Sequence, residues 1–209
     1  MSSDAKNIIS SSLHNLSLIK GRMITLREIL SSVDCGQISY VLLSNIDCGY
    51  LCVRKIIEEL MLLSVCAHIE AGAEISKKIL KQYRPSDRDA SMGAINEKFF
   101  PDAFDIVPIE DPNILGKFIE VDAPYLDVEF SKNMYKVANS ILHSDYRYID
   151  EGDYKIRVDN LKDFYARSER LLRNFQIDTS KYGIVFLGQL CLDEYGPPKL
   201  YTGESKSLA

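Results

Sequence analysis

Polar side chains with catalytic potential gather in residues 143–148, where a helix is expected to end. His143 is followed closely by Asp145, Tyr146 and Arg147, which places an imidazole, a carboxylate, a phenol and a guanidinium within one short stretch. A histidine can move a proton and an arginine can stabilise developing negative charge, so these groups could bind or cleave a phosphodiester. The same residues could simply end the helix, because a histidine interacts favourably with the negative end of the helix dipole. Both interpretations are open.

A second set of charged residues lies in the most apolar part of the chain. Arg54 and Glu58 stand four residues apart, as do Lys55 and Glu59, so each pair can meet along one side of a helix. This spacing predicts a solvated, ion-paired helix face.

These two regions supply the candidate site residues. The candidate catalytic residues of a phosphodiester-cleaving or nucleotide-binding site are His143, Arg147 and Arg54, provided that helix packing brings Arg54 near His143. The candidate binding residues beside them are Glu58, Asp145 and Tyr146.

The common sequence motifs of enzymes are absent. The chain contains no phosphate loop, no Gly-x-Gly-x-x-Gly, no His-Glu-x-x-His and no Gly-x-Ser-x-Gly. Its three histidines leave few choices for a histidine-dependent mechanism. Of these, His14 is expected on the polar side of a helix, and His68 in the core or at a helix end.

Cysteine usage indicates a reducing compartment. The five cysteines are odd in number and include no Cys-x-x-Cys, so free thiols are expected rather than a disulfide framework. Cys48, Cys52 and Cys66 fall near one side of a predicted helix, where we expect small buried core residues rather than zinc ligands. We expect neither a metal nor another cofactor.

The composition is that of a globular chain with an acidic balance. Of the 209 residues 46% are hydrophobic, and the formal net charge is -5. This charge argues against a protein built mainly to hold nucleic acid, although a local basic patch is compatible with it. Apolar runs fall far short of the roughly 20 residues that a membrane span needs, and the first residues do not resemble a secretion signal. We therefore expect a cytoplasmic protein without a membrane segment.

Helical periodicity covers most of the chain. Apolar residues recur every three or four positions in six segments, each of which predicts a helix. The segments are 4–30, 47–67, 74–83, 86–99, 126–143 and 156–175. Asp47 is the expected cap of the second helix, and Gly21 should weaken the first by roughly 1 kcal/mol relative to alanine. The predicted fold class is mainly α, a helical bundle of about five to six helices with a C-terminal β-hairpin.

Two segments depart from the helical pattern. Four prolines between 100 and 124 forbid a long helix, so residues 100–124 are expected to form a long Pro-rich loop with a short extended piece near Lys117 to Val121. Residues 182–203 carry strand-forming residues on both sides of a Gly-Pro-Pro turn, which predicts the hairpin. Because a lone hairpin is marginal in water, it should lie against the helices or be completed by a partner. We interpret residues 1–209 as a single helical domain.

The order of elements supports a family resemblance. An apolar helix with Arg-Lys-Ile-Ile-Glu-Glu-Leu at 54–60 is followed by Phe-Phe-Pro at 99–101, a helix that closes in Leu142-His143, a last helix and a hairpin. Over residues 38–202 this order resembles a group of bacterial helical proteins whose core is similar to the HEPN superfamily. HEPN proteins are helical bundles, often dimeric; many are RNA-cutting toxins or components of antiviral defence, and others bind or scaffold. The resemblance implies a role in bacterial conflict or stress.

The chain departs from the family pattern in its catalytic residues. Catalytic HEPN members carry an arginine followed, after four to six residues, by a histidine, and no arginine precedes His14, His68 or His143 at that spacing. Position 139, four residues before His143, is an asparagine. We therefore expect a non-enzymatic module that forms a homodimer or binds a partner protein, in a bacterial defence, toxin-antitoxin or stress system.

Two other functions stay open. One is an RNA-cleaving or nucleotide-binding enzyme that uses His143, Arg147 and Arg54, for which RNA would be a partner. The other is a small-molecule sensor with a ligand between the helices, although aromatic residues at helical spacing, such as Tyr50 and Tyr135, more often belong to a core.

Overall fold

The computed structural model describes residues 3–33, 39–82, 84–107, 117–143, 149–193 and 196–204, with side chains from residue 12 onward. These residues form six α-helices, a short 3-10 helix (Ser180–Tyr182) and a sheet of five strands. The α-helices are α1 (Ser3–Val33), α2 (Tyr40–Glu70), α3 (Lys77–Leu80), α4 (Pro85–Gly93), α5 (Val128–Leu142) and α6 (Glu151–Arg173). The strands are β1 (Asp102–Val107), β2 (Lys117–Glu120), β3 (Phe175–Thr179), β4 (Ile184–Gln189) and β5 (Lys199–Glu204).

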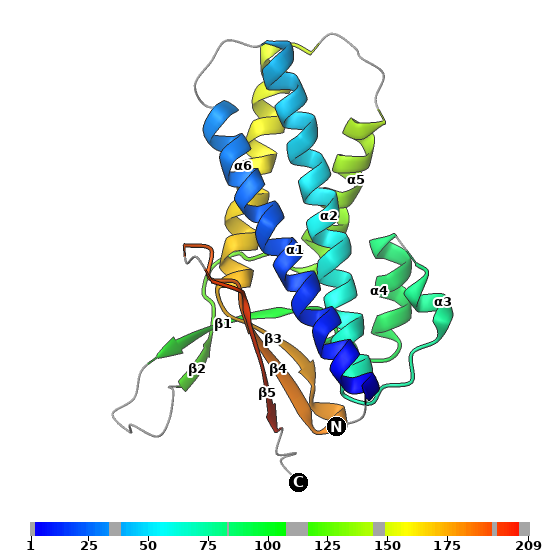
Figure 1. The fold of residues 1–209 in the computed structure, drawn as a ribbon. Helices are drawn as coiled ribbons and strands as arrows, with labels where there is room; N and C mark the ends of the chain where they lie inside the picture. Colours follow the sequence, from blue (N-terminus) through cyan, green and yellow to red (C-terminus); the bar gives the residue numbers. More distant parts are fainter. Residues whose placement is uncertain are drawn as a thin grey trace.

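The helices form a bundle with α2 at its centre. α1 packs antiparallel to α2, α5 and α6 lie along other sides of α2, and α4 lies beside its C-terminal half with α3 farther out (Figure 1). A helix that is packed on several sides needs apolar residues around much of its circumference, and α2 has them. The fully buried side chains include Leu16, Ile19, Met23, Ile46, Tyr50, Ile56, Ile57 and Phe164. None of the helices in the described ranges combines the length and the apolar character needed to cross a membrane.

α2 begins earlier than the sequence predicted. The Ser39 side chain caps the helix by accepting a hydrogen bond from the backbone N–H of Leu42 (3.3 Å), whereas Asp47, the predicted cap, lies within the helix. Both residue types can cap a helix, and no residue between them breaks one. The earlier cap therefore adds about two turns to α2.

Gly49 lets α6 approach α2 closely. A Cβ atom added at Gly49 would lie 2.9 Å from Cδ1 of Leu161, a fully buried residue of α6. A larger residue would push the two helices apart or displace the leucine. Gly21 in α1 differs, because a Cβ added there meets nothing within 4 Å.

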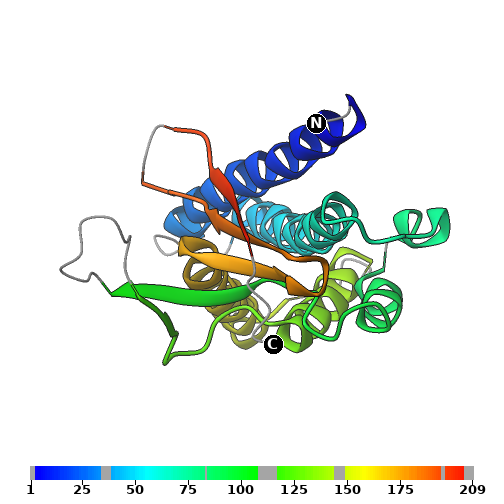
Figure 2. The ribbon, with the colours of Figure 1, turned by 90° about the horizontal axis from the view of Figure 1, so that it is seen from below.

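The sheet closes one end of the bundle. Its strand order is β2-β1-β3-β4-β5 and all neighbouring strands are antiparallel; Figure 2 shows it lying across the ends of the helices. Phe175 and Ile177 of β3 and Phe186 of β4 are buried and join the helical core. Gly188 of β4 lies opposite Phe175, and a Cβ atom there would be 2.0 Å from the Phe175 ring. The aromatic ring thus occupies the space that the glycine leaves.

The helical bundle and the C-terminal hairpin are confirmed, but the sheet is larger than predicted. β4 and β5 form the hairpin, and β3, β1 and β2 extend it to five strands. The predicted loop 100–124 contains β1 and β2, of which β2 matches the predicted extended piece near Lys117. The last helix ends at Arg173, and Phe175, predicted to continue it, begins β3. The hairpin is therefore completed within the chain.

The two helices predicted between α2 and the Pro-rich segment are shorter than expected. Among the described residues 74–82 only Lys77–Leu80 is helical, and the helix predicted to reach Phe99 ends at Gly93. Phe99 and Phe100 are nevertheless buried. They anchor the connection between α4 and β1 to the core, which explains their apolar spacing without a helix.

Candidate functional site

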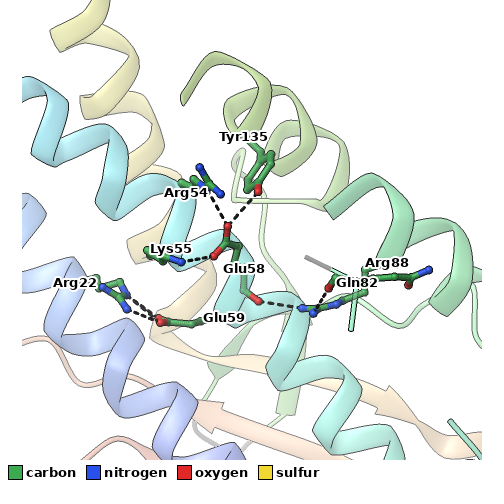
Figure 3. Close-up of polar contacts among 8 residues, drawn as sticks. All are labelled: Arg22, Arg54, Lys55, Glu58, Glu59, Gln82, Arg88 and Tyr135. Atoms are coloured by element: carbon green, nitrogen blue, oxygen red, sulfur yellow. Dashed lines mark hydrogen bonds and ion pairs between the residues drawn. The ribbon is translucent and has the colours of Figure 1, made fainter. Parts of the chain in front are cut away.

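A dense group of polar contacts surrounds Glu58 on α2 (Figure 3). Its carboxylate accepts hydrogen bonds from Arg54 Nε (2.9 Å), Lys55 Nζ (2.7 Å) and Tyr135 Oη (3.0 Å). Arg54 and Lys55 precede Glu58 by about one turn of α2, whereas Tyr135 comes from α5. The predicted pairing of Arg54 with Glu58 is confirmed, and the same carboxylate also joins α2 to α5.

The groups around Glu58 keep its carboxylate charged. Burial alone would raise its pKa, but hydrogen bonds from Lys55, Arg54 and Tyr135 outweigh burial and lower the pKa below its ordinary value. The hydrogen bond to Glu58 in turn raises the pKa of Arg54. Burial, together with the charge of Glu58, raises the pKa of Tyr135. At neutral pH Tyr135 is therefore a neutral phenol that donates to an ionised carboxylate.

The contacts of Glu58 and Arg54 within the protein compete with any role of these side chains in catalysis. The guanidinium carbon of Arg54 lies 5.6 Å from the centre of the Tyr135 ring, a cation-π distance, in addition to its bond to Glu58. A general base needs an available lone pair and a pKa near the working pH, and Glu58 has three donors and a lowered pKa. We interpret the Glu58 cluster (Arg54, Lys55, Glu58 and Tyr135) as a tie between two helices.

Glu59 pairs with α1 and not with Lys55. Arg22 donates to the Glu59 carboxylate from Nε (3.0 Å to each oxygen) and from Nη2 (2.7 Å), and this bond raises the pKa of Arg22. The predicted Lys55–Glu59 pair is therefore wrong. The predicted solvated face is found only in part. The side chains of Arg54 and Lys55 are 30% and 41% exposed, whereas those of Glu58 and Glu59 are 16% and 10% exposed between their neighbouring helices.

Arg88 of α4 reaches the same stretch of α2. Its side chain is buried, and it donates from Nη1 to the backbone carbonyl of Glu58 (3.3 Å) and from Nη2 to the backbone carbonyl of Gln82. The Glu58 carbonyl already lies in the interior of a helix, so this contact supplies it with a second donor. Arg88 thereby fixes α4, and the chain before it, against the middle of α2.

His143 lies at the C-terminal end of α5 with an exposed side chain. Its backbone N–H donates to the carbonyl of Asn139 (3.1 Å) and closes the last turn. Within the described residues, no hydrogen bond or ring contact joins His143 to Arg54, so the structure does not bring these two candidates together. The remaining candidates lie outside the described residues: Asp145, Tyr146 and Arg147.

One side of α5 nevertheless runs from the Glu58 cluster to His143. Tyr135, Asn139 and His143 follow one another at intervals of four residues, which places them along the same side of the helix. Asn139 follows Tyr135 by about one helical turn, between the Glu58 cluster and His143. The buried end of this row is Tyr135, beside Arg54, and the exposed end is His143.

His68 is fully buried near the end of α2, which confirms the expected core or helix-end position. Its Nδ1 lies 2.8 Å from the carbonyl of Ser64 and its Nε2 lies 3.0 Å from Nδ2 of Asn96. Because a carbonyl only accepts, Nδ1 carries the proton and Nε2 accepts from Asn96, which also donates to the carbonyl of Asp178 on β3 (2.5 Å). Burial lowers the pKa of His68. The neutral ring thus links α2 to the sheet.

The cysteines only partly follow the prediction. Cys66 is buried and Cys52 is half-buried, but Cys48 is exposed, so the expectation of a core position is wrong for Cys48. Among the residues with described positions, no three His, Cys, Asp or Glu side chains come together in a way that could hold a metal ion.

Two surface hollows lie away from the predicted site. One, of about 300 Å³, is lined by residues that include Phe100, Tyr125 and Asp178. The other, of about 200 Å³, lies between α6 and the end of β4, with Leu172 and Leu190 among its lining residues. Of the candidate residues whose positions the structure describes, none lines either hollow.

The sequence did not reveal the partners that complete the Glu58 region. Tyr135 was expected in the core, where it does lie, but its hydroxyl contact with a residue 77 positions earlier has no sequence signal. Arg22 pairs across 37 positions and Arg88 contacts a backbone carbonyl. One signal was available in the sequence: Arg88 falls at helical spacing between Pro85 and Met92, on the side of α4 that is buried.

Comparison of the chain with family models, with curated proteins and with solved structures finds no match. The functional interpretation therefore rests on the residues described above.

Proposed function

We propose that the chain is a non-enzymatic, HEPN-like helical module of the cytoplasm that forms a homodimer or binds a partner protein in a bacterial defence, toxin-antitoxin or stress system. The observation that carries this proposal is the closed character of the Glu58 cluster. The strongest candidates for acid-base and phosphate chemistry in α2, Glu58 and Arg54, are engaged with each other and with Tyr135.

The position of His143 supports the same proposal. A ribonuclease site of the family type places a histidine and an arginine on the same phosphodiester, and here His143 is exposed at a helix end with no contact to Arg54 among the described residues. Proton transfer needs groups within hydrogen-bond reach of the reacting atoms. A chain with this arrangement is better suited to binding than to cleavage.

Support for a binding role also comes from exposed apolar side chains. Tyr40 and Val41, in the first turn of α2, are 91% and 69% exposed, and Ile156 near the start of α6 is 60% exposed. Both helix starts lie at the end of the bundle away from the sheet (Figure 1). Large apolar side chains that gather on one end of a molecule are typical of protein interaction sites.

The alternative is an RNA-cleaving or nucleotide-binding enzyme with a non-standard site around His143. The observation that favours it is the row of Tyr135, Asn139 and His143 on α5, which leads from Arg54 to the surface. An RNA strand that lies along this side of α5 would pass the guanidinium of Arg54, the amide of Asn139 and the imidazole of His143 in turn.

Incubation of purified protein with labelled RNA separates the two functions. We expect the wild-type chain to cleave RNA no faster than its His143→Ala and Arg54→Ala variants, because neither residue is placed for catalysis. Cleavage by the wild-type chain that both substitutions abolish, while circular dichroism shows both variants to be folded, would establish the enzyme and refute the proposal.

A further inference from the structure

The surface around α3 carries an isolated group of positive charges. Lys77, Lys78, Lys81 and Arg84, here called the basic segment, are all exposed. Residues 75–86 contain no aspartate or glutamate, although the whole chain has a net charge of -5. Figure 2 shows α3 at the outer edge of the molecule, beyond α4. The segment is therefore accessible to a partner.

The side chains of the basic segment have no acidic partner within the described part of the chain. Arg22, Arg54, Lys55, Lys132 and Arg167 all form ion pairs with acidic side chains. In contrast, none of the four side chains of the basic segment forms an ion pair within the described part of the chain. Their charges are thus available to an anionic partner.

The segment is held firmly to the bundle. Gln82 donates from its side chain to the hydroxyl of Ser91 on α4 (2.9 Å), and its backbone carbonyl accepts from the buried Arg88. Pro85 is buried at the start of α4. Because these contacts fix the backbone directly after Lys81, a partner that binds here does not have to order that part of the chain.

An apolar side chain lies among these charges. Leu80 is 41% exposed between Lys78 and Lys81. A phosphate backbone makes no use of such a residue, whereas a protein segment can place an apolar side chain against it and carboxylates around it.

The extent of the positive charge also favours a protein partner over RNA. Glu74 before the segment and Asp87 after it are exposed and bound it on both sides. A protein whose RNA or DNA binding rests on 6–10 phosphate contacts needs about twice the number of cations present here. An extended RNA strand would run onto these acidic residues, whereas a short acidic peptide would not.

We propose that the basic segment, with Leu80 at its centre, is a docking surface for an acidic protein segment that carries a large apolar residue between its carboxylates. This inference rests on the proposed partner-binding function and names the chemistry of one partner. It concerns a surface remote from His143 and independent of any cleavage.

Fluorescence anisotropy with a labelled peptide of glutamates around one central leucine tests the proposal on the full chain. We expect binding at low ionic strength that weakens about three- to tenfold in the Lys78→Ala/Lys81→Ala variant, because exposed ion pairs each contribute about 0.2–1 kcal/mol. The matched control, Lys136→Ala/Lys155→Ala, removes the same charge from exposed positions of α5 and α6 and should change binding less than about twofold.

A second variant tests the apolar contact. Leu80→Ala should weaken binding of the leucine peptide about threefold and leave binding of an all-glutamate peptide of equal charge unchanged. Tighter binding of a single-stranded RNA of equal charge, lost in the same lysine variant, would overturn the proposal in favour of nucleic acid. Absence of peptide binding, or equal loss in the control variant, would also overturn it. These results are distinct from failure of the proposed function, which the oligomer mass and the RNA cleavage assay measure separately.

Discussion

Replacement of Tyr135 by phenylalanine removes one hydroxyl from the contact between α2 and α5. The hydroxyl donates to the Glu58 carboxylate at 3.0 Å, and the Glu58 side chain is 16% exposed. A hydrogen bond to a charged group contributes about 1.5–3 kcal/mol to stability. Since Arg54 and Lys55 still satisfy the carboxylate and the ring still packs beside Arg54, we expect Tyr135→Phe to lower the free energy of unfolding by about 1–2 kcal/mol.

Urea denaturation followed by circular dichroism measures this change. The control is Tyr201→Phe, because Tyr201 is 56% exposed on β5 and its substitution should alter stability by less than about 0.5 kcal/mol. A double-mutant cycle with Glu58→Gln isolates the pair, since the effect of Tyr135→Phe should shrink when the acceptor is no longer charged. A Tyr135→Phe variant as stable as the wild type, or an effect that Glu58→Gln leaves unchanged, would show that Glu58 does not tie the two helices.

Three further predictions concern charge and packing. Because the pKa of Glu58 is lowered in the folded state, the ionised carboxylate should stabilise the fold above pH 4.5, the ordinary pKa of the group, and this stabilisation should be lost as the pH falls below that value. The free energy of unfolding should therefore fall less steeply with acid in Glu58→Gln than in the wild type, as measured by denaturation at a series of pH values. Asn96→Ala should lower the free energy of unfolding by about 1–3 kcal/mol, because the buried Nε2 of His68 loses its donor; wild-type-like stability in thermal unfolding would contradict this. Gly49→Ala should destabilise by about 1–3 kcal/mol, since the new Cβ lies 2.9 Å from a leucine of α6, whereas Gly21→Ala, with open space, should stabilise by about 0.5–1 kcal/mol. Equal effects of the two glycine substitutions in urea denaturation would refute the packing argument.

The long helices were predictable because their apolar residues repeat at the helical period over many turns. α1 and α5 begin and end within three residues of the predicted segments, whereas α6 begins five residues and ends two residues earlier than predicted. The strands were harder to predict from the sequence. β1 and β2 are short and lie among prolines. The sequence shows that these prolines exclude a long helix, but it does not show that a hairpin can form between them. Phe175 continues the spacing of α6, but its backbone pairs with β1 and β4 and its ring packs on Gly188, and neither contact can be read from the sequence.

In the candidate site, too, local contacts were predictable and contacts between distant residues were not. The Arg54–Glu58 pair is local, four residues apart on one helix, and sequence reasoning found it. Tyr135 and Arg22 meet their partners only through the packing of separate helices, so no spacing rule identifies them. The same packing explains why Glu58 and Glu59 are largely covered by other helices and why Glu59 pairs with Arg22 of α1 rather than with Lys55.

Native mass spectrometry of the protein purified at low ionic strength from the cells that naturally produce it tests the central claim most directly. The proposed function predicts a defined homodimer, or a stoichiometric complex with a protein companion, without bound RNA or nucleotide. A monomer without a companion would contradict it. Bound RNA or nucleotide that disappears in the His143→Ala variant would contradict it as well, and would establish that the end of α5 is a nucleic-acid site.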